Sequence, residues 1–378
     1  MKRKIDKTFL NIYQNKKVLV TGHTGFVGGW LCLWLKRLGA KVVGYSLSPT
    51  SKPNIFESIS LNNTIENHCI GDIREFEQVL KYFEEQQPEI VFHLAAQPLV
   101  RLSYDDPILT YSTNVLGTVN ILEALRKTTS VRSAVIVTSD KCYENQEWLF
   151  GYRETDPMGG HDPYSSSKGC SELVTWAYQK SFFNPSDYEI NHQVCISSVR
   201  AGNIIGGGDW GKDRLIPDMV KAFSNNKSLL IRHPKAIRPW QFVLEPLSGY
   251  LWIGALMHRF GCKYSQAWNL GPDSADSITV EQIVNAFQEE WGGGEYGVVE
   301  ETEYHEANWL KLDTNKAYSL LKWRPLYNTL QALRETAKWY KNFYSESPED
   351  VLNFTLAQID AYLCKARRIG VKWVKEDK

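Results

Sequence analysis

The chain has 378 residues, and 43 lysines and arginines balance 43 aspartates and glutamates, so its formal net charge is zero. With 43% hydrophobic and 23% charged residues, the composition is that of a folded globular protein and excludes a disordered or fibrous one. The balanced charge argues against a partner that is nucleic acid or an anionic membrane surface, and no apolar stretch approaches the roughly 18 residues that a membrane-spanning helix needs.

Strand-like and helix-like segments alternate through the first two-thirds of the chain. Short β-branched runs predict strands at 17–21, 41–45, 90–95, 134–138 and 194–199. Helical spacing of apolar residues predicts helices at 26–38, 107–127 and 164–182. The dipeptides Asp106-Pro107 and Asp162-Pro163 each place an N-cap before a proline at the first helical position. The alternation predicts an α/β fold, a doubly wound parallel sheet with helices on both faces.

The pattern becomes irregular after about Gly206 and richer in glycine, proline and tryptophan. We expect a helix at 244–260, a short strand at 268–270, and a last helix that begins at Ser347-Pro348-Glu349. The last helix should bury one face, formed by Leu352, Leu356, Ile359 and Leu363. We expect a main domain formed by residues 1–204, to which the chain returns for 241–271. Residues 205–240 and 272–344 should form a smaller substrate-binding region, and residues 345–378 a C-terminal helical extension.

Three glycines follow the first predicted strand at the start of the first helix. Gly22, Gly25 and Gly28 form a Gly-x-x-Gly-x-x-Gly run. A pyrophosphate binds against the free N–H groups of a helix N-terminus, and side chains there would block its approach. The strand before and the helix after the run distinguish it from an ordinary glycine-rich turn, so the sequence predicts a dinucleotide site.

The second strand does not identify the dinucleotide. It ends Gly44-Tyr45-Ser46, with neither the acidic residue that holds a ribose nor an arginine that would accept a ribose phosphate. The choice between NAD and NADP is therefore open at this strand. Asp72, in the segment Gly71-Asp72-Ile73 between the predicted strands at 41–45 and 90–95, is placed to reach the adenine, with a helix N-cap as the alternative.

Tyr164 and Lys168 are four residues apart, so they share one face of a helix. A nearby ammonium favours the phenolate, which can accept a proton from an alcohol as hydride leaves its carbon. The pair alone is common by chance. Ser139, directly after the predicted strand at 134–138, adds a hydroxyl that can hold the substrate alcohol, and the three together predict a catalytic site.

These motifs resemble the extended short-chain dehydrogenase/reductase family, which has a Rossmann-type fold. The longer segments 93–104, 138–143, 151–168, 199–210, 213–218 and 237–250 resemble the members that dehydrate CDP-glucose, and the similarity runs from about residue 9 to 340. The resemblance implies a lyase that uses NAD as its cofactor. It implies cofactor contacts from Gly22, Thr24, Gly25, Phe26, Val27, Gly28, Tyr45, Asp72, Ile73, Leu94, Ala95, Ala96, Asn114, Tyr164 and Lys168.

The implied reaction is an internal redox cycle that forms CDP-4-keto-6-deoxyglucose from CDP-glucose. Hydride leaves carbon 4 of the sugar for NAD, water is lost across carbons 5 and 6, and the hydride returns to carbon 6. Asp140 matches the acid that protonates the departing hydroxyl, for which burial would have to raise its pKa. Lys141 stands where dTDP-sugar relatives have a glutamate base, and it must lose its proton to serve as one. A salt-bridged loop pair is the alternative for both residues.

A nucleotide sugar carries a pyrophosphate, for which the planar guanidinium of arginine is well suited. Arg238 matches the arginine that binds this pyrophosphate in related enzymes, and Asn203 matches a phosphate contact. Further candidate substrate contacts are Gln97, Arg101, Ser139, Arg214, Arg232 and His305, with surface ion pairs as the alternative for Arg214 and Arg232. The histidines show no metal-ligand spacing, so we expect no metal.

The family resemblance also implies a homodimer or homotetramer, assembled through the helices that begin at Pro107 and Tyr164. The seven cysteines form no Cys-x-x-Cys pair, which is typical of reduced thiols in a cytoplasmic protein. Two other functions remain open from the sequence. Another nucleotide-sugar dehydratase or 4-epimerase would use the same Ser139, Tyr164 and Lys168, whereas a non-catalytic NAD-binding regulator should have lost one of them.

Overall fold

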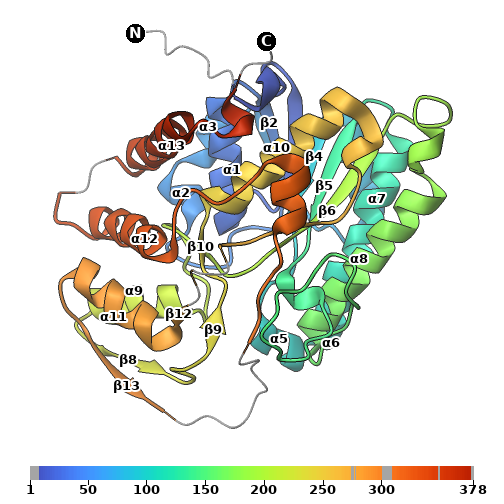
Figure 1. The fold of residues 1–378 in the computed structure, drawn as a ribbon. Coiled ribbons are helices and arrows are strands. Elements are labelled where there is room, and N and C mark those ends of the chain that lie inside the picture. The colour runs from blue at the N-terminus through green and yellow to red at the C-terminus, as the bar shows by residue number, and fades with distance from the viewer. Residues whose placement is uncertain (1–7, 274–275, 277, 300–308, 348–349, 376–378) are drawn as a thin grey trace.

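A seven-stranded parallel sheet forms the centre of the structure, a computed structural model that describes residues 8–273, 276, 278–299, 309–347 and 350–375 (Figure 1). The strand order is β11-β6-β5-β4-β1-β2-β3, and every neighbouring pair is parallel. The strands are β1 (Lys17–Thr21), β2 (Lys41–Ser46), β3 (Asn67–Ile70), β4 (Ile90–His93), β5 (Ser133–Val137), β6 (Cys195–Ala201) and β11 (Trp268–Leu270). The predicted α/β fold is confirmed. The order reverses between β1 and β4, the switch point at which such sheets bind ligands.

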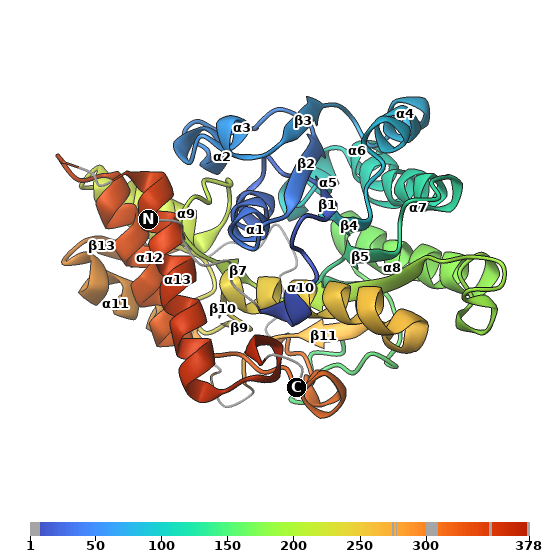
Figure 2. The ribbon, with the colours of Figure 1, turned by 90° about the horizontal axis from the view of Figure 1, so that it is seen from above.

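Helices cover both faces of this sheet (Figure 2). Val18 and Val20 of β1 contribute to the core beneath α1 (Phe26–Arg37) and α10 (Leu244–Phe260), whereas Leu19 between them contributes to a second core. The second core lies beneath α4 (Phe76–Gln86) and α7 (Gly117–Lys127). Successive side chains of a strand point to opposite faces, and a strand buried on both sides therefore reads as a continuous apolar run.

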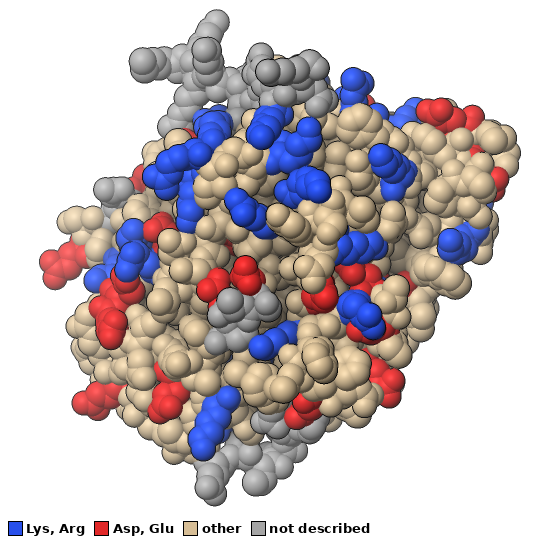
Figure 3. Space-filling model, viewed as in Figure 1, with Lys and Arg blue, Asp and Glu red and all other residues tan. Residues whose placement is uncertain are grey.

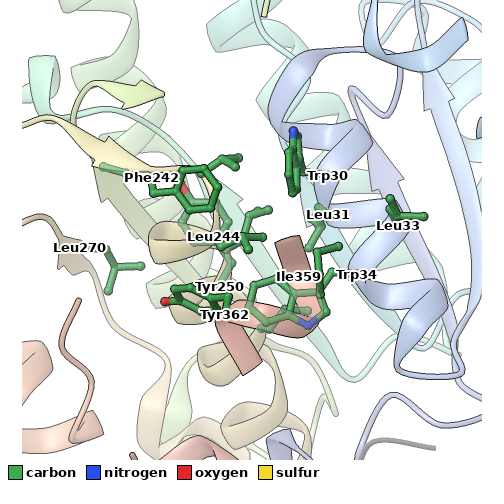
Figure 4. Packing of buried hydrophobic residues seen from close by; sticks show 14 of the residues in the cluster. Trp30, Leu31, Leu33, Trp34, Phe242, Leu244, Tyr250, Leu270, Ile359 and Tyr362 are labelled. Atoms are coloured by element: carbon green, nitrogen blue, oxygen red, sulfur yellow. The ribbon is translucent and has the colours of Figure 1, made fainter. Parts of the chain in front are cut away.

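The C-terminal helix α13 (Val351–Ile369) packs into the larger core. Figure 4 shows Ile359 and Tyr362 of this helix beside Trp34 of α1 and Tyr250 of α10. The predicted start of the helix at Ser347 is wrong, and residues 348–349 lie outside the described part of the chain. The helix begins at Val351 because the Asp350 carboxylate accepts the Leu352 N–H at 2.9 Å and so caps the first turn.

Two predicted boundaries in the main domain are also corrected. The expected helix at 107–127 consists of α6 (Pro107–Tyr111), a π-helical turn at Ser112–Leu116, and α7. The expected strand at 90–95 ends at His93, because the Thr21 hydroxyl oxygen accepts the N–H groups of both Leu94 and Ala95 at 3.2 Å. The chain therefore leaves the sheet at the switch point.

The predicted N-caps and several predicted elements are confirmed. The Asp106 carboxylate accepts the Leu109 N–H at 2.8 Å, and Asp162 accepts the Ser165 N–H at 2.9 Å. Asp162 thus begins α8 (Pro163–Ser181), which contacts β6 and α7. The helix at 244–260 and the strand at 268–270 have the expected bounds.

Short elements build the part of the molecule at the carboxyl edge of the sheet. Its described strands pair two by two: β7 (Ile204–Ile205) with β10 (Gln241–Phe242), β9 (Ile237–Arg238) with β12 (Ile278–Thr279), and β8 (Ser228–Ile231) with β13 (Glu295–Val298). The helices α9 (Leu215–Ser224), α11 (Val280–Trp291) and α12 (Thr329–Phe343) accompany them. Remaining helices of the described chain are short: α2 (Ile55–Ser58), α3 (Leu61–Thr64) and α5 (Val100–Asp105). Two-residue strands carry no periodicity, so the sequence did not predict them.

Surface charge is distributed unevenly despite the balanced total. Figure 3 shows lysine and arginine gathered over the upper part of the visible face, with acidic side chains more frequent below and at its edges. Among the described residues, no helix combines the length and the apolar character needed to cross a bilayer.

Candidate active site

The glycine-rich turn between β1 and α1 leaves no room for a side chain at Gly22 or Gly28. Gly22 has a φ of +77°, and a Cβ there would lie 2.8 Å from the Ala95 nitrogen. A Cβ on Gly28 would lie 2.1 Å from the Gly22 carbonyl oxygen. Gly25 is the N-cap residue of α1 and has no side chain with which to occupy the first N–H groups of that helix. This bare helix N-terminus fits the pyrophosphate of a dinucleotide.

The remaining residues of the turn lie between the ends of β1 and β2. The Thr24 hydroxyl donates to the Leu47 carbonyl at 2.8 Å and lies 2.9 Å from the Ser46 hydroxyl, so it ties the turn to the end of β2. Phe26 and Val27, the first residues of α1, are partly exposed beside it. All the predicted contacts of the turn therefore lie at one place on the carboxyl edge of the sheet.

Tyr45, Asp72 and Ile73 lie together at the ends of β2 and β3. The Tyr45 hydroxyl donates to the Asp72 carbonyl at 3.2 Å, and a Cβ on Gly71 would lie 2.5 Å from the Tyr45 ring. Hydrogen bonds from Arg74 lower the pKa of the Asp72 carboxyl. The N-cap of the following helix α4 is Glu75, so the alternative role of Asp72 as a helix cap is wrong.

Asn114, in the π-helical turn, joins the segment after β4 to the helix α8. Its Oδ1 accepts the Gln97 N–H at 2.8 Å, and its Nδ2 donates to the Gln97 carbonyl at 3.1 Å and to the Ser167 hydroxyl at 2.8 Å. The Gln97 side chain itself is buried and bonds to Leu99 and Thr110, which favours a structural role for this amide. Asn114 thus fixes the position of residues 94–97 relative to α8, the helix that carries Tyr164 and Lys168.

Tyr164 and Lys168 occupy one buried face of α8. Burial raises the pKa of the Tyr164 phenol to about 12, while a hydrogen bond with Ser139 and the positive charge of Arg214 act in the opposite direction. Burial lowers the pKa of Lys168 to about 8. Ser139, also buried, follows β5 and faces Tyr164. The structure therefore brings the three predicted catalytic groups together.

Asp140 is a buried carboxyl group beside these residues. Its Oδ1 accepts the Ser139 hydroxyl at 3.1 Å, and its Oδ2 has no hydrogen-bond partner among the described residues. Burial raises the pKa of Asp140, against the opposing effects of Lys141, Ser139 and Arg238. Lys141 is half-buried on the same turn, whereas Glu144 is exposed. A buried carboxyl with a raised pKa has the properties of a general acid.

The predicted arginines lie at two places. Arg101 and Arg232 approach the same carboxylate, that of Asp213, at 3.7 and 3.8 Å. Arg214 pairs with Asp209 at 2.9 Å and is close enough to Tyr164 to affect its pKa. Arg238 lies on β9, near Asp140, and lines a small pocket with Pro239, Pro272 and Lys311.

The two remaining predicted substrate contacts are Asn203 and His305. Asn203 lies between β6 and β7, and its carbonyl accepts the N–H of Gln241, the first residue of β10, at 2.9 Å. His305 lies outside the described residues.

A buried ion pair between Glu172 and Arg200, which was not predicted from the sequence, lies behind the turn that carries Ser139, Asp140 and Lys141, the catalytic turn. Glu172 is one helical turn beyond Lys168 on the same face, and this spacing was the available signal. Arg200, within an apolar strand, gave no signal of a partner. No group of three or more potential metal ligands occurs in the described part of the chain.

The chain matches the model of the NAD dependent epimerase/dehydratase family over residues 18–271. It is 51% identical over 365 residues to a CDP-glucose 4,6-dehydratase of Salmonella typhimurium, an alignment that covers 96% of this chain and 100% of the relative. It is 26% identical over 341 residues to a dTDP-glucose 4,6-dehydratase of Xanthomonas campestris, covering 85% of this chain and 92% of that protein.

Solved structures show the same fold at lower identity. A UDP-glucose 4-epimerase of Thermotoga maritima with UDP-glucose superposes with a TM-score of 0.73 at 21% identity, covering 87% of this chain and all of the other. A dTDP-glucose 4,6-dehydratase of Bacillus anthracis in complex with NAD has a TM-score of 0.71 at 22% identity, covering 86% of this chain and 96% of that one.

Proposed function

Because this chain belongs to the NAD dependent epimerase/dehydratase family, we propose that it is a lyase that converts CDP-glucose into CDP-4-keto-6-deoxyglucose. The observation that carries the proposal is the 51% identity over the full length of a CDP-glucose 4,6-dehydratase. The buried Asp140 beside Ser139 and Tyr164 supports it, because a dehydratase needs an acid at the leaving hydroxyl.

The cofactor is NAD, in keeping with the family. When bound, NAD would supply a reversible hydride acceptor for the oxidation at carbon 4 of the sugar and the reduction at carbon 6. Gly22, Gly25 and Gly28 would admit its pyrophosphate to the N-terminus of α1. Tyr45, Asp72 and Ile73 would hold its adenosine, and residues 94–96 with Asn114 would line the path to Tyr164 and Lys168.

Tyr164 accepts the proton of the 4-hydroxyl in this proposal. The Tyr164 phenol must first lose its own proton, and burial disfavours that loss because it raises the pKa of the phenol. The hydrogen bond with Ser139 and the charge of Arg214 both favour the phenolate. Lys168, four residues along the same face, supplies a further donor, and Ser139 orients the substrate alcohol.

Asp140 and Lys141 perform the loss of water. Burial raises the pKa of Asp140, which favours the protonated form that can donate to the departing 6-hydroxyl. Lys141 removes the proton from carbon 5, which requires the neutral amine. The half-buried position of Lys141, against the exposed Glu144, supports Lys141 as the base.

The segments 205–240 and 272–344 bind the nucleotide part of the substrate. Arg238 stands next to Asp140, at a distance from which its charge acts on that carboxyl, and so it can hold the pyrophosphate close to the reacting sugar. Arg101 and Arg232 lie near Asp213, and Arg214 pairs with Asp209. We propose His305 and Asn203 as further contacts of the same substrate.

An apolar surface over α6 and α8 supports the proposed homodimer. Ile108 is 81% exposed, and Leu116, Leu173 and Trp176 are also exposed on helices that contact one another. Such a surface is typical of a subunit interface. Light scattering should give a dimer or tetramer for the natural chain and a monomer for Leu173→Glu/Trp176→Glu; a monomeric natural chain would contradict this assembly.

The product distinguishes this function from that of a 4-epimerase on the same scaffold. The purified protein is incubated separately with CDP-, dTDP-, UDP- and GDP-glucose, and the products are identified by NMR and mass spectrometry. We expect rapid turnover of CDP-glucose alone, with loss of one water. An epimerised sugar of unchanged mass would assign a 4-epimerase, and turnover of another nucleotide sugar in preference would overturn the substrate.

A further inference from the structure

A buried ion pair lies directly behind the turn that carries Ser139, Asp140 and Lys141. Arg200 of β6 donates from Nη2 to Glu172 Oε2 of α8 at 2.8 Å, and the two side chains are 3% and 4% exposed. Neither residue binds substrate or transfers a proton in the reaction proposed above. A fully buried ion pair is weak evidence for stabilisation, because desolvation offsets the attraction. The partners of the pair indicate a different role.

We propose that Glu172 and Arg200 are positioning residues that fix both ends of the catalytic turn and thereby hold Ser139 and Asp140 in their working geometry. This inference rests on the proposed function, because it concerns the same site.

Glu172 holds the beginning of the turn. Its Oε1 accepts the hydroxyl of Thr138, the residue immediately before Ser139, at 2.5 Å. Its Oε2 accepts the Ser198 hydroxyl at 2.7 Å as well as Arg200. Both carboxylate oxygens are therefore occupied, and Thr138 is linked through them to β6.

Arg200 holds the end of the turn. Its Nη1 donates to the hydroxyl of Tyr143 at 2.5 Å, and its guanidinium carbon lies 4.9 Å from the centre of the Tyr143 ring. The Tyr143 hydroxyl in turn donates to Asn269 Oδ1 at 2.7 Å. Residues 139–142 are thus held between two anchored positions, Thr138 and Tyr143. An anchor at each end restricts the turn more than either anchor alone.

The pair also connects this turn to the catalytic helix. Glu172 is one turn beyond Lys168 on α8, and its negative charge acts to raise the pKa of Lys168 against the effect of burial. One carboxylate therefore contacts the residue before Ser139 and lies on the same helical face as Tyr164. The Arg200 Nε atom has no hydrogen-bond partner among the described residues. The guanidinium therefore lies where its Nη atoms reach Glu172 and Tyr143, although this position leaves one buried donor unsatisfied.

Thr138 provides the sharpest test, because two variants differ there by the hydroxyl. Thr138→Val keeps the shape of the side chain and removes its donor to Glu172, whereas Thr138→Ser keeps the donor. We expect Thr138→Val to lower kcat for CDP-glucose about tenfold to a hundredfold with KM changed less than about twofold, because misplaced catalytic groups affect turnover more than binding. Thr138→Ser should retain most of the natural kcat. Equal kcat values for the two variants would overturn the proposal.

Glu172→Gln tests the carboxylate itself, with Glu245→Gln as the matched control. Glu245 is a fully buried carboxyl of α10 that bonds to Tyr362 and to the N–H groups of Leu326 and Tyr327, away from the catalytic turn. Both variants are compared by thermal melting and by steady-state kinetics below their melting temperatures. We expect Glu172→Gln to lose kcat by at least about tenfold more than Glu245→Gln at similar stability.

The outcomes separate this inference from the proposed function. A natural protein that does not act on CDP-glucose contradicts the function itself. An active natural protein whose Glu172→Gln variant folds and loses no more kcat than Glu245→Gln shows that the ion pair is merely structural. If Glu172→Gln does not fold, the comparison of Thr138→Val with Thr138→Ser decides, since those changes leave the ion pair intact.

Discussion

Replacing Lys168 by methionine should make the protein more stable while abolishing its activity. The Lys168 side chain is buried, and its pKa falls from 10.5 to about 8 chiefly because the charged form is desolvated. Each pKa unit corresponds to about 1.4 kcal/mol, so the buried charge destabilises the folded protein by roughly 3 kcal/mol at neutral pH. Methionine has a similar length and no charge, so Lys168→Met removes this cost.

The pH dependence identifies the charge as the cause. Below about pH 8 the folded and unfolded chains both carry the Lys168 proton, and the penalty is complete. Between about pH 8 and 10.5 the unfolded chain binds more protons than the folded one, so the natural protein gains stability as the pH rises. The advantage of the variant should therefore shrink across this range.

Urea unfolding followed by tryptophan fluorescence measures both effects. At about pH 7 we expect Lys168→Met to unfold with a free energy higher by about 1–3 kcal/mol, since the loss of favourable interactions, such as the attraction to the charge of Glu172, offsets part of the gain. At about pH 10 most of the charge penalty is gone, so the advantage of the variant should be smaller than at pH 7 by roughly 2 kcal/mol. A variant that is less stable at neutral pH, or a difference that does not change with pH, would show that the buried charge of Lys168 does not destabilise the folded protein.

Three further substitutions test separate parts of the site. Tyr164→Phe should fold and bind NAD but lose about 10²–10⁴-fold in turnover, measured by product formation; near-normal activity would exclude Tyr164 as the base. Lys141→Met should let CDP-glucose reduce the bound cofactor yet form no 4-keto-6-deoxy product, whereas the natural protein in heavy water should place deuterium at carbon 5; product at a comparable rate would assign the base to another group. Gly28→Ala should weaken NAD binding in calorimetry by at least about tenfold, because its Cβ would lie 2.1 Å from the Gly22 carbonyl oxygen, and unchanged affinity would contradict the pyrophosphate site.

The sequence predicted those elements whose residues form strong local signals. Asp106-Pro107 and Asp162-Pro163 begin their helices as expected, because a carboxylate cap and a proline act within one turn. The central strands were recognisable because burial on both faces makes them continuous apolar runs. The π-helical turn at Ser112–Leu116 was not predicted, since its apolar spacing does not differ enough from that of an α-helix.

The parts of the candidate site that could be predicted are those whose residues lie within a few positions of one another in the sequence. Tyr164 and Lys168 belong to this class, and so do the glycines of the turn. Contacts between distant segments were not predictable: Glu172 meets Arg200 across 28 residues and Tyr143 meets Asn269 across 126. The raised pKa of Asp140 likewise depends on burial, which the sequence alone does not give.

The fate of the hydrogen on carbon 4 of the sugar is the most direct test of the proposed reaction. A mixture of CDP-glucose carrying deuterium at carbon 4 and unlabelled CDP-glucose is converted by the purified protein, and the products are analysed by mass spectrometry and NMR. The proposed internal transfer predicts deuterium at carbon 6 of the molecules that began with it, and none at carbon 6 of the unlabelled ones. Deuterium lost to solvent, retained at carbon 4, or spread between the two sets of molecules would contradict it.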